Sequence, residues 1–154
     1  MQEDSVGSAD PLALSQQVCY SLSMAARGVV AAYKPLLEPL GLTHPQYLVM
    51  VALWEHGPLQ VKDLGVLLSL DSGTLSPLLK RLDTMGLVSR QRSVSDERQV
   101  TVALTTRGQQ LRQPAEKVQE EVVRRLGLNA DELAQLRTVL DRVKAATADA
   151  MTGR

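Results

Sequence analysis

The segment from Leu70 to Arg98, LDSGTLSPLLKRLDTMGLVSRQRSVSDER, decides the fold of this chain. Its first half places leucines at helical spacing behind a capping Asp71, and Gly86 is suited to end the helix. Its second half and the following QVTVALT are β-rich runs of alternating character around a polar, charged tip, which is typical of a hairpin. This order predicts the reading helix and wing of a winged helix-turn-helix.

Upstream of this segment, apolar periodicity predicts two helices, a short strand and a third helix. The first helix is expected from Pro11 to about Tyr33 and is broken by Lys34-Pro35. The second lies in THPQYLVMVALWEHG, with Thr43 as its cap and Gly57 as its end. The short strand is expected around Leu59 to Val61, and the helix that follows carries Leu64, Leu67 and Leu68.

Downstream of the hairpin, the pattern predicts two more helices. Thr105 or Thr106 can cap a long helix with Val118, Val122 and Leu126 on one face, and a last helix is expected from Asn129 to Thr147. The apolar stripes of the outer helices have no obvious partner within the chain, and such stripes commonly bury each other across a two-fold dimer axis. The simpler alternative is that they pack on their own domain.

The predicted fold is mainly α with a small β-hairpin wing, an α+β winged helix-turn-helix with N- and C-terminal dimerisation helices. Residues 1–10 are expected to be a disordered leader and residues 11–154 a single domain. Within it, about 45–104 form the winged helix-turn-helix, while 11–34 and 106–150 are the dimerisation helices. We expect a homodimer.

Composition limits the possible functions. Seventeen basic and seventeen acidic residues leave no net charge, so any affinity for nucleic acid requires a local basic patch. One cysteine allows neither an internal disulfide nor a paired-cysteine metal site, and we expect no metal and no cofactor. The polar start of the chain is unlike a secretory signal and no apolar run approaches the ~18 residues of a membrane span, so a cytoplasmic protein is expected.

The reading helix predicts a DNA-binding face opposite its leucines. From Ser72 to Arg92 the segment holds four basic residues and one acidic residue, a local charge of +3. Arg98 at the wing tip is suited to the minor groove, and Asp96 could orient its guanidinium by a bidentate pair. Pro77 should bend the helix or leave the carbonyl of Gly73 unpaired. The predicted DNA-contact residues are Ser72, Gly73, Thr74, Ser76, Pro77, Lys80, Arg81, Arg90, Arg92, Asp96 and Arg98.

This helix–wing order resembles the MarR family of bacterial winged-helix regulators, whose Asp-x-Arg wing signature matches DER at residues 96–98. Three stretches further resemble its organic hydroperoxide resistance regulators (OhrR): QVCYSL, YKPLLEPLGLTHPQYLVMVALWEH and the segment quoted first, together spanning roughly residues 16–98. The resemblance implies a homodimeric repressor that binds pseudo-palindromic operator DNA and leaves it when an organic hydroperoxide oxidises the first-helix cysteine. It also implies a protein that is not an enzyme.

The resemblance also assigns the redox-sensing residues. Cys19 falls on the position of the sensing thiol, and Tyr33 matches a tyrosine that reaches across the dimer to hydrogen-bond that thiol. His44 stands where the family commonly has a second such tyrosine, and Tyr47 matches another tyrosine of the same region.

The chemistry of such a sensor follows from general principles. A thiol attacks a peroxide as the thiolate, and hydrogen bonds from phenol or imidazole donors favour the charged form. The product is a sulfenic acid. Because the chain holds a single cysteine, a small cellular thiol is the expected partner for a mixed disulfide.

Three alternatives remain open from the sequence. Cys19 could be an inert buried residue in a MarR-type regulator that is released by a small hydrophobic ligand. The chain could also be a thiol peroxidase, although it lacks a resolving cysteine. Finally, it could be a winged-helix adaptor that binds protein, which would show no salt-dependent affinity for DNA.

Overall fold

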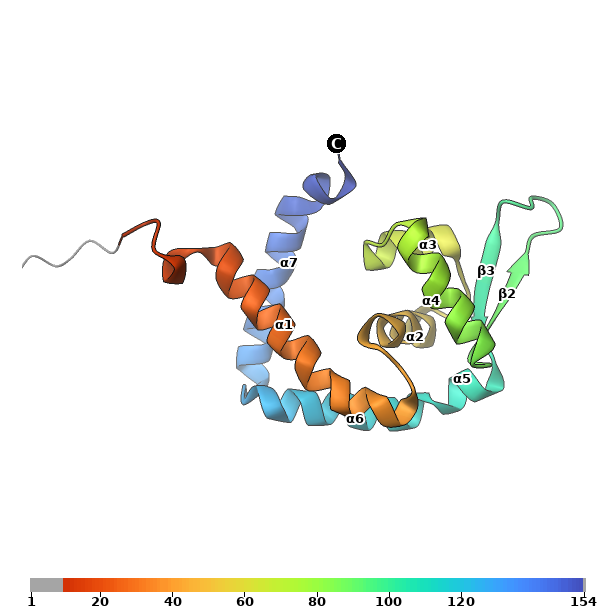
Figure 1. Ribbon diagram of the computed structural model, residues 1–154, viewed down its shortest axis with the longest axis horizontal. Coiled ribbons are helices and arrows are strands. Elements are labelled where there is room, and N and C mark those ends of the chain that lie inside the picture. Colours follow the sequence, from red (N-terminus) through yellow and green to blue (C-terminus); the bar gives the residue numbers. More distant parts are fainter. Residues whose placement is uncertain (1–9, 154) are drawn as a thin grey trace, which may run out of the picture.

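The computed structural model describes residues 10–153, so all but the last residue of the predicted leader lies outside the described residues. The chain is mainly helical with one small antiparallel sheet (Figure 1). The elements in chain order are η1 (Leu14–Gln16), α1 (Val18–Leu37), η2 (Glu38–Leu40), α2 (His44–His56), β1 (Leu59–Gln60), α3 (Val61–Leu68), α4 (Ser72–Thr84), β2 (Val88–Arg92), β3 (Val100–Leu104), α5 (Thr106–Gln110), α6 (Arg112–Leu126) and α7 (Ala130–Thr152). The predicted fold class is confirmed.

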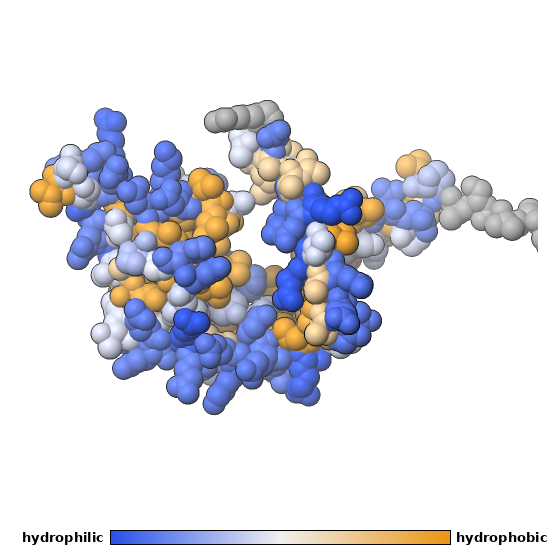
Figure 2. All heavy atoms as spheres, turned by 180° about the vertical axis from the view of Figure 1, so that it is seen from behind, coloured by the Kyte–Doolittle hydropathy of each residue, from blue (hydrophilic) through white to orange (hydrophobic). Residues whose placement is uncertain are grey.

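The elements form a base with two arms. Helices α1 and α6 pack against each other along the base, and α2 lies above them (Figure 1). At one end, α3, α4 and the hairpin of β2 and β3 form the winged helix-turn-helix, while α7 and the N-terminal half of α1 rise at the other end. Seen from behind, the two arms are separated by an open hollow with apolar side chains on both sides (Figure 2).

The sheet has the strand order β1-β3-β2. The hairpin register pairs Val88 with Leu104 and Arg92 with Val100. Val88 and Val102 are buried, whereas the strand residues from Arg90 to Arg92 are exposed. The hairpin is therefore anchored at its base and projects its tip into solvent.

Capping interactions explain where most helices begin. Thr43 and Gln46 form a reciprocal capping box at the start of α2, and Asp71 accepts from the backbone N–H of Thr74 at 2.7 Å. Thr105 caps α5 and Asn129 caps α7 in the same way. The caps at Thr43, Asp71 and Thr105 agree with the sequence prediction, and Asn129, expected as the first residue of the last helix, is its cap.

Four predicted boundaries are wrong, and one of them is the end of the last helix, which lies at Thr152 and not at Thr147. The first α-helix begins at Val18, because the extended backbone of Gln17 separates it from η1, and not at Pro11. It also continues through Pro35 to Leu37; the residue whose carbonyl loses its partner, Ala31, is exposed and can bond to water. The long helix after the hairpin is divided into α5 and α6 at Leu111.

The core lies between α1, α2, α4, α6 and the sheet. Fully buried side chains include Leu37, Met50, Leu53, Leu82 and Val122. In contrast, no residue of α7 is buried, and every residue of α1 from Val18 to Gly28 is exposed. Leu136 and Val139 of α7 are 43% and 53% exposed. These two helical segments present apolar surface that this chain does not cover.

Candidate DNA-binding surface and redox site

Helix α4 separates an apolar face from a polar one. Leu75, Leu79 and Leu82 are buried against the core. The eleven residues predicted to contact DNA are all exposed, from Ser72 at the start of α4 to Arg98 in the wing. Helix α4 is continuous through Pro77; Gly73, whose carbonyl the proline leaves without a helical partner, is exposed.

The reading helix, the wing, α3 and the end of α7 border one hollow of about 790 Å³. Ser72 and Ser76 of α4 line it, together with Arg90, Arg92 and Arg98 from the hairpin. The structure thus brings hydroxyl groups and three guanidinium groups to one side of the molecule. This combination suits the phosphates and base edges of a duplex.

The carboxylates of Asp83 and Asp96 stabilise the conformation of the hairpin on this surface. Asp83 at the end of α4 accepts a hydrogen bond from Nε of Arg90 at 3.1 Å, which ties the hairpin to the reading helix. Asp96 accepts from the backbone N–H of Arg98 at 3.0 Å. Among the ion pairs of the described residues there is none between Asp96 and the Arg98 guanidinium, so Asp96 shapes the loop and leaves that side chain free. The predicted bidentate pair is absent.

A network at the base of the wing was not predicted from the sequence. Thr105 donates from its backbone N–H to the carbonyl of Leu87 at 3.1 Å and from its hydroxyl to the carbonyl of Gly86 at 2.6 Å. Nε1 of Trp54 donates to the carbonyl of Gly108 at 3.0 Å. These bonds join α2, the end of α4 and the start of α5.

Cys19 lies in the first turn of α1 and is exposed. Tyr33 lies fourteen residues later on the same helix, which corresponds to about 21 Å along its axis. The thiol and this tyrosine therefore cannot meet within one chain.

Tyr33, His44 and Tyr47 form a compact aromatic cluster where α1 meets the start of α2. The ring centroids of Tyr33 lie 5.1 Å from His44 and 5.3 Å from Tyr47. Both tyrosines are buried, whereas His44 is half-buried. The structure thus brings together three of the four predicted redox-site residues and leaves Cys19 apart.

The polar groups of the cluster are held by α6. Tyr33 donates its hydroxyl to Oε1 of Gln119 at 2.6 Å, and the Tyr47 hydroxyl lies 3.5 Å from the same oxygen. Gln119 was missed by sequence reasoning because nothing local marks a residue that is 86 positions from its partner.

Burial governs the pKa values of the cluster. Burial raises the pKa of Tyr33, and it raises that of Tyr47 to about 12 with help from the neighbouring Tyr33. Burial also lowers the pKa of His44 from 6.5. At neutral pH both phenols are therefore protonated donors and the imidazole is neutral.

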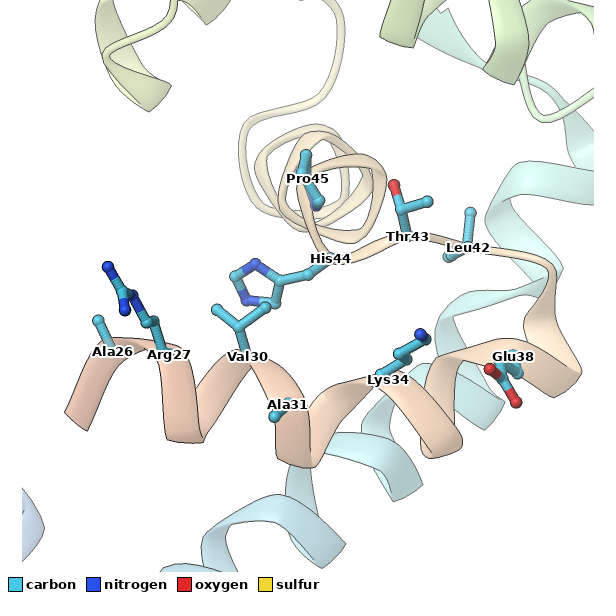
Figure 3. A pocket seen from close by; sticks show the side chains of 10 residues that line it. All are labelled: Ala26, Arg27, Val30, Ala31, Lys34, Glu38, Leu42, Thr43, His44 and Pro45. Atoms are coloured by element: carbon cyan, nitrogen blue, oxygen red, sulfur yellow. The ribbon is translucent and has the colours of Figure 1, made fainter. Parts of the chain in front are cut away.

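His44 faces an apolar groove of about 710 Å³ between α1 and the start of α2 (Figure 3). Its imidazole points towards Val30, and Ala26 lies further towards the exposed half of α1. Arg27, Lys34 and Glu38 lie at the edges of the groove. The groove is continuous with the uncovered surface of α1 described above.

Within residues 10–153, no helix has the length and apolarity needed to cross a membrane. The same residues contain no cluster of three or more side chains suited to hold a metal ion.

Comparison with known proteins identifies the family. The pattern of the family described as transcriptional regulator SarA/Rot matches residues 31–114. The organic hydroperoxide resistance transcriptional regulator of Bacillus subtilis is 41% identical over 131 residues, covering 85% of this chain and 89% of the relative. The chain belongs to the MarR/SarA family of winged-helix transcriptional regulators. The predicted family is confirmed.

Solved structures of the MarR/SarA family share the whole architecture. The structure of reduced AbfR bound to DNA superposes on this chain with a TM-score of 0.75 at 34% identity, covering 90% of this chain and 94% of that one. A further matching structure is that of AbfR of Staphylococcus epidermidis. MarR of E. coli in its apo form has a TM-score of 0.68 at 29% identity, covering 82% of this chain and 96% of that one. As a member of this family, the chain is a DNA-binding transcriptional regulator.

Proposed function

We propose that this protein is a peroxide-sensing repressor, which binds pseudo-palindromic operator DNA as a homodimer while Cys19 is reduced. Oxidation of Cys19 by an organic hydroperoxide releases it. The observation that carries the proposal is an exposed thiol on an uncovered helix, in a chain 41% identical to an organic hydroperoxide resistance regulator.

The apolar stripe of α1 supports a dimer that joins the two halves of the redox site. Positions 19, 22, 26, 29, 33 and 37 share one face at helical spacing. Tyr33 and Leu37 on this face are buried by their own chain, while Cys19 and Ala26 are exposed. In the proposed dimer, a partner protomer covers the N-terminal half of the stripe.

An antiparallel crossing of two α1 helices at Ala26 would complete the site. Cys19 precedes Ala26 by seven residues and Tyr33 follows it by seven, so a two-fold axis at Ala26 places each thiol opposite the other chain's Tyr33. His44 lies 5.1 Å from Tyr33 between ring centroids and faces the same groove. Each sensing site then takes its sulfur from one protomer and its donors from the other.

The chemistry of the site is a two-electron oxidation. The Cys19 thiolate attacks the distal peroxide oxygen; the S–O bond forms, the O–O bond breaks, and the product is a sulfenic acid. The alkoxide leaving group takes a proton from a neighbouring donor or from water and departs as an alcohol. A small cellular thiol then condenses with the sulfenic acid, forming a mixed disulfide and releasing water.

Oxidation adds bulk and polarity at the seam between the two α1 helices. A close-packed interface responds by changing its arrangement. The two reading helices must match half-sites about 34–36 Å apart, so a small rotation of the protomers misaligns them. A coupling free energy of a few kcal/mol between Cys19 oxidation and DNA binding is enough to release the protein from an operator.

An electrophoretic gel-shift with DNA from beside the protein's own gene tests the proposal. The wild type should leave this DNA when titrated with cumene hydroperoxide, and Cys19→Ser should stay bound. Ser21→Ala, a change at an exposed position on the side of the same helix away from the stripe, is the control and should behave as wild type.

Release of the Cys19→Ser variant at the wild-type peroxide concentration would refute the sensing role. The protein would then answer another signal, such as a small hydrophobic ligand in the groove beside His44. Sustained consumption of peroxide with a thiol reductant, far beyond one equivalent, would instead indicate a peroxidase.

A further inference from the structure

Gln119 of α6 occupies a position that the peroxide-sensing scheme does not use. Its side-chain oxygen is the acceptor for the Tyr33 hydroxyl at 2.6 Å, and the Tyr47 hydroxyl approaches the same oxygen at 3.5 Å. An amide oxygen has two lone pairs and can accept from both phenols. One side chain on α6 therefore accepts the hydroxyl proton of Tyr33 and lies within reach of the Tyr47 hydroxyl.

A phenol has only one proton to donate. While Tyr33 donates to Gln119, its oxygen can offer a partner thiol only a lone pair, and this hydrogen bond favours the protonated thiol. When the same proton turns towards the sulfur, the hydrogen bond favours the thiolate, which is the form that reacts with peroxide. The choice of acceptor by Tyr33 thus decides the reactivity of the sulfur.

We propose that Gln119 is a positioning residue that restrains peroxide sensing by competing with the Cys19 thiolate for the hydroxyl proton of Tyr33. This inference rests on the proposed function. Cys19 then reacts with peroxide more slowly than it would if Tyr33 had no competing acceptor. This slower reaction sets a threshold on the hydroperoxide concentration that triggers release from DNA.

Tyr47 lowers the free-energy cost of turning the Tyr33 hydroxyl from Gln119 to the sulfur. When Tyr33 turns away, the Tyr47 hydroxyl lies 3.5 Å from the Gln119 oxygen and needs to approach by roughly 0.5–0.8 Å to form a full hydrogen bond. Burial raises the pKa of Tyr47 to about 12, so this second donor keeps its proton throughout the physiological range. The amide oxygen is therefore never left without a partner.

The titratable groups around Gln119 come from α1, α2 and α6. His44 and Tyr47 of α2 face Tyr33, while Glu55 of α2 and Arg112 and Glu116 of α6 share a small hollow with Gln119. Arg112 and Glu116 neutralise each other through an ion pair of 3.1 Å.

Two substitutions at Gln119 should act in opposite directions. Gln119→Leu removes the acceptor at nearly constant volume, which frees the Tyr33 proton. Gln119→Glu provides a charged and stronger acceptor, which holds that proton more firmly. Gln119 is itself exposed, so Gln113→Leu and Gln113→Glu make the same changes at another exposed glutamine of α6 and serve as matched controls.

The assay is the rate of sulfenic acid formation at Cys19 with cumene hydroperoxide, trapped by dimedone and followed by mass spectrometry from pH 5 to 9. We expect Gln119→Leu to react about three- to tenfold faster than wild type near pH 7, with its rate profile shifted to lower pH; this is the scale expected for gaining one hydrogen bond to a charged group. Gln119→Glu should react more slowly by a similar factor, and both Gln113 variants should match wild type.

Equal rates and equal pH profiles for wild type and both Gln119 variants would overturn this inference. So would a change of both variants in the same direction, because loss of packing alone does not distinguish a stronger from a missing acceptor. If wild-type Cys19 itself forms no sulfenic acid, the proposed function fails instead.

Discussion

If α7 forms part of the interface of the proposed homodimer, two of its exposed apolar side chains should contribute strongly to association. Leu136 and Val139 are 43% and 53% exposed in the single chain. Burying a whole leucine or valine side chain contributes roughly 1.5–3 kcal/mol, so covering the exposed half of each contributes about 1 kcal/mol. In a two-fold dimer each side chain occurs twice, so the double variant Leu136→Ala/Val139→Ala should lose about 4 kcal/mol of association free energy.

That loss corresponds to a dissociation constant raised roughly a thousandfold. Sedimentation velocity across a dilution series from about 0.01 to 100 µM measures the change. The control is Val66→Ala on α3, which truncates an apolar side chain that is 75% exposed and lies outside α7, and it should leave the dimer unchanged. A double variant that dimerises as tightly as wild type would refute the assignment of α7 to the interface.

Three further predictions concern pH, packing and DNA. Because burial lowers the pKa of His44, this side chain binds a proton more readily in the unfolded chain than in the folded one, and the free energy of unfolding should fall on acidification from pH 7.5 to 5.5. The urea midpoint of His44→Gln should fall less than that of the wild type over the same range. An equal fall would contradict this reasoning. Gly108→Ala places a Cβ 2.1 Å from the carbonyl oxygen of Leu87, so it should cost more than about 3 kcal/mol in thermal or urea unfolding, and near-wild-type stability would show that this junction can relax. Arg98→Ala should lower the slope of log affinity against log salt by about 2 per dimer if the guanidinium meets phosphates, measured by fluorescence anisotropy; an unchanged slope would remove Arg98 from the contact surface.

The parts of the fold that the sequence predicted are those with local signals. Asp71 caps α4 because a carboxylate at that position accepts from an N–H three residues later, a contact that needs nothing from the rest of the chain. Gly57 and Gly86 follow their helices with positive φ, as expected of residues that end a helix. The hairpin likewise followed from its alternation.

The errors lie where distant packing overrides local preference. Pro35 was expected to end the first helix, but the next turn continues because Leu37 is wholly buried and the lost backbone partner faces solvent. The aromatic cluster could be named from the family resemblance but could not be assembled from spacing. Gln119 had no local signal, since both of its partners lie more than 70 residues away.

The hydrogen bonds around Thr105 and Gly108 have a mechanical consequence. They fasten the hairpin, the last turn of α4 and the tryptophan of α2 to the helix that leads into α6. If α6 tilts at the boundary between the proposed subunits, the wing and the reading helix must rotate with it as one rigid body. After oxidation, each subunit would then still bind a single half-site, and only the distance and angle between the two reading helices would change.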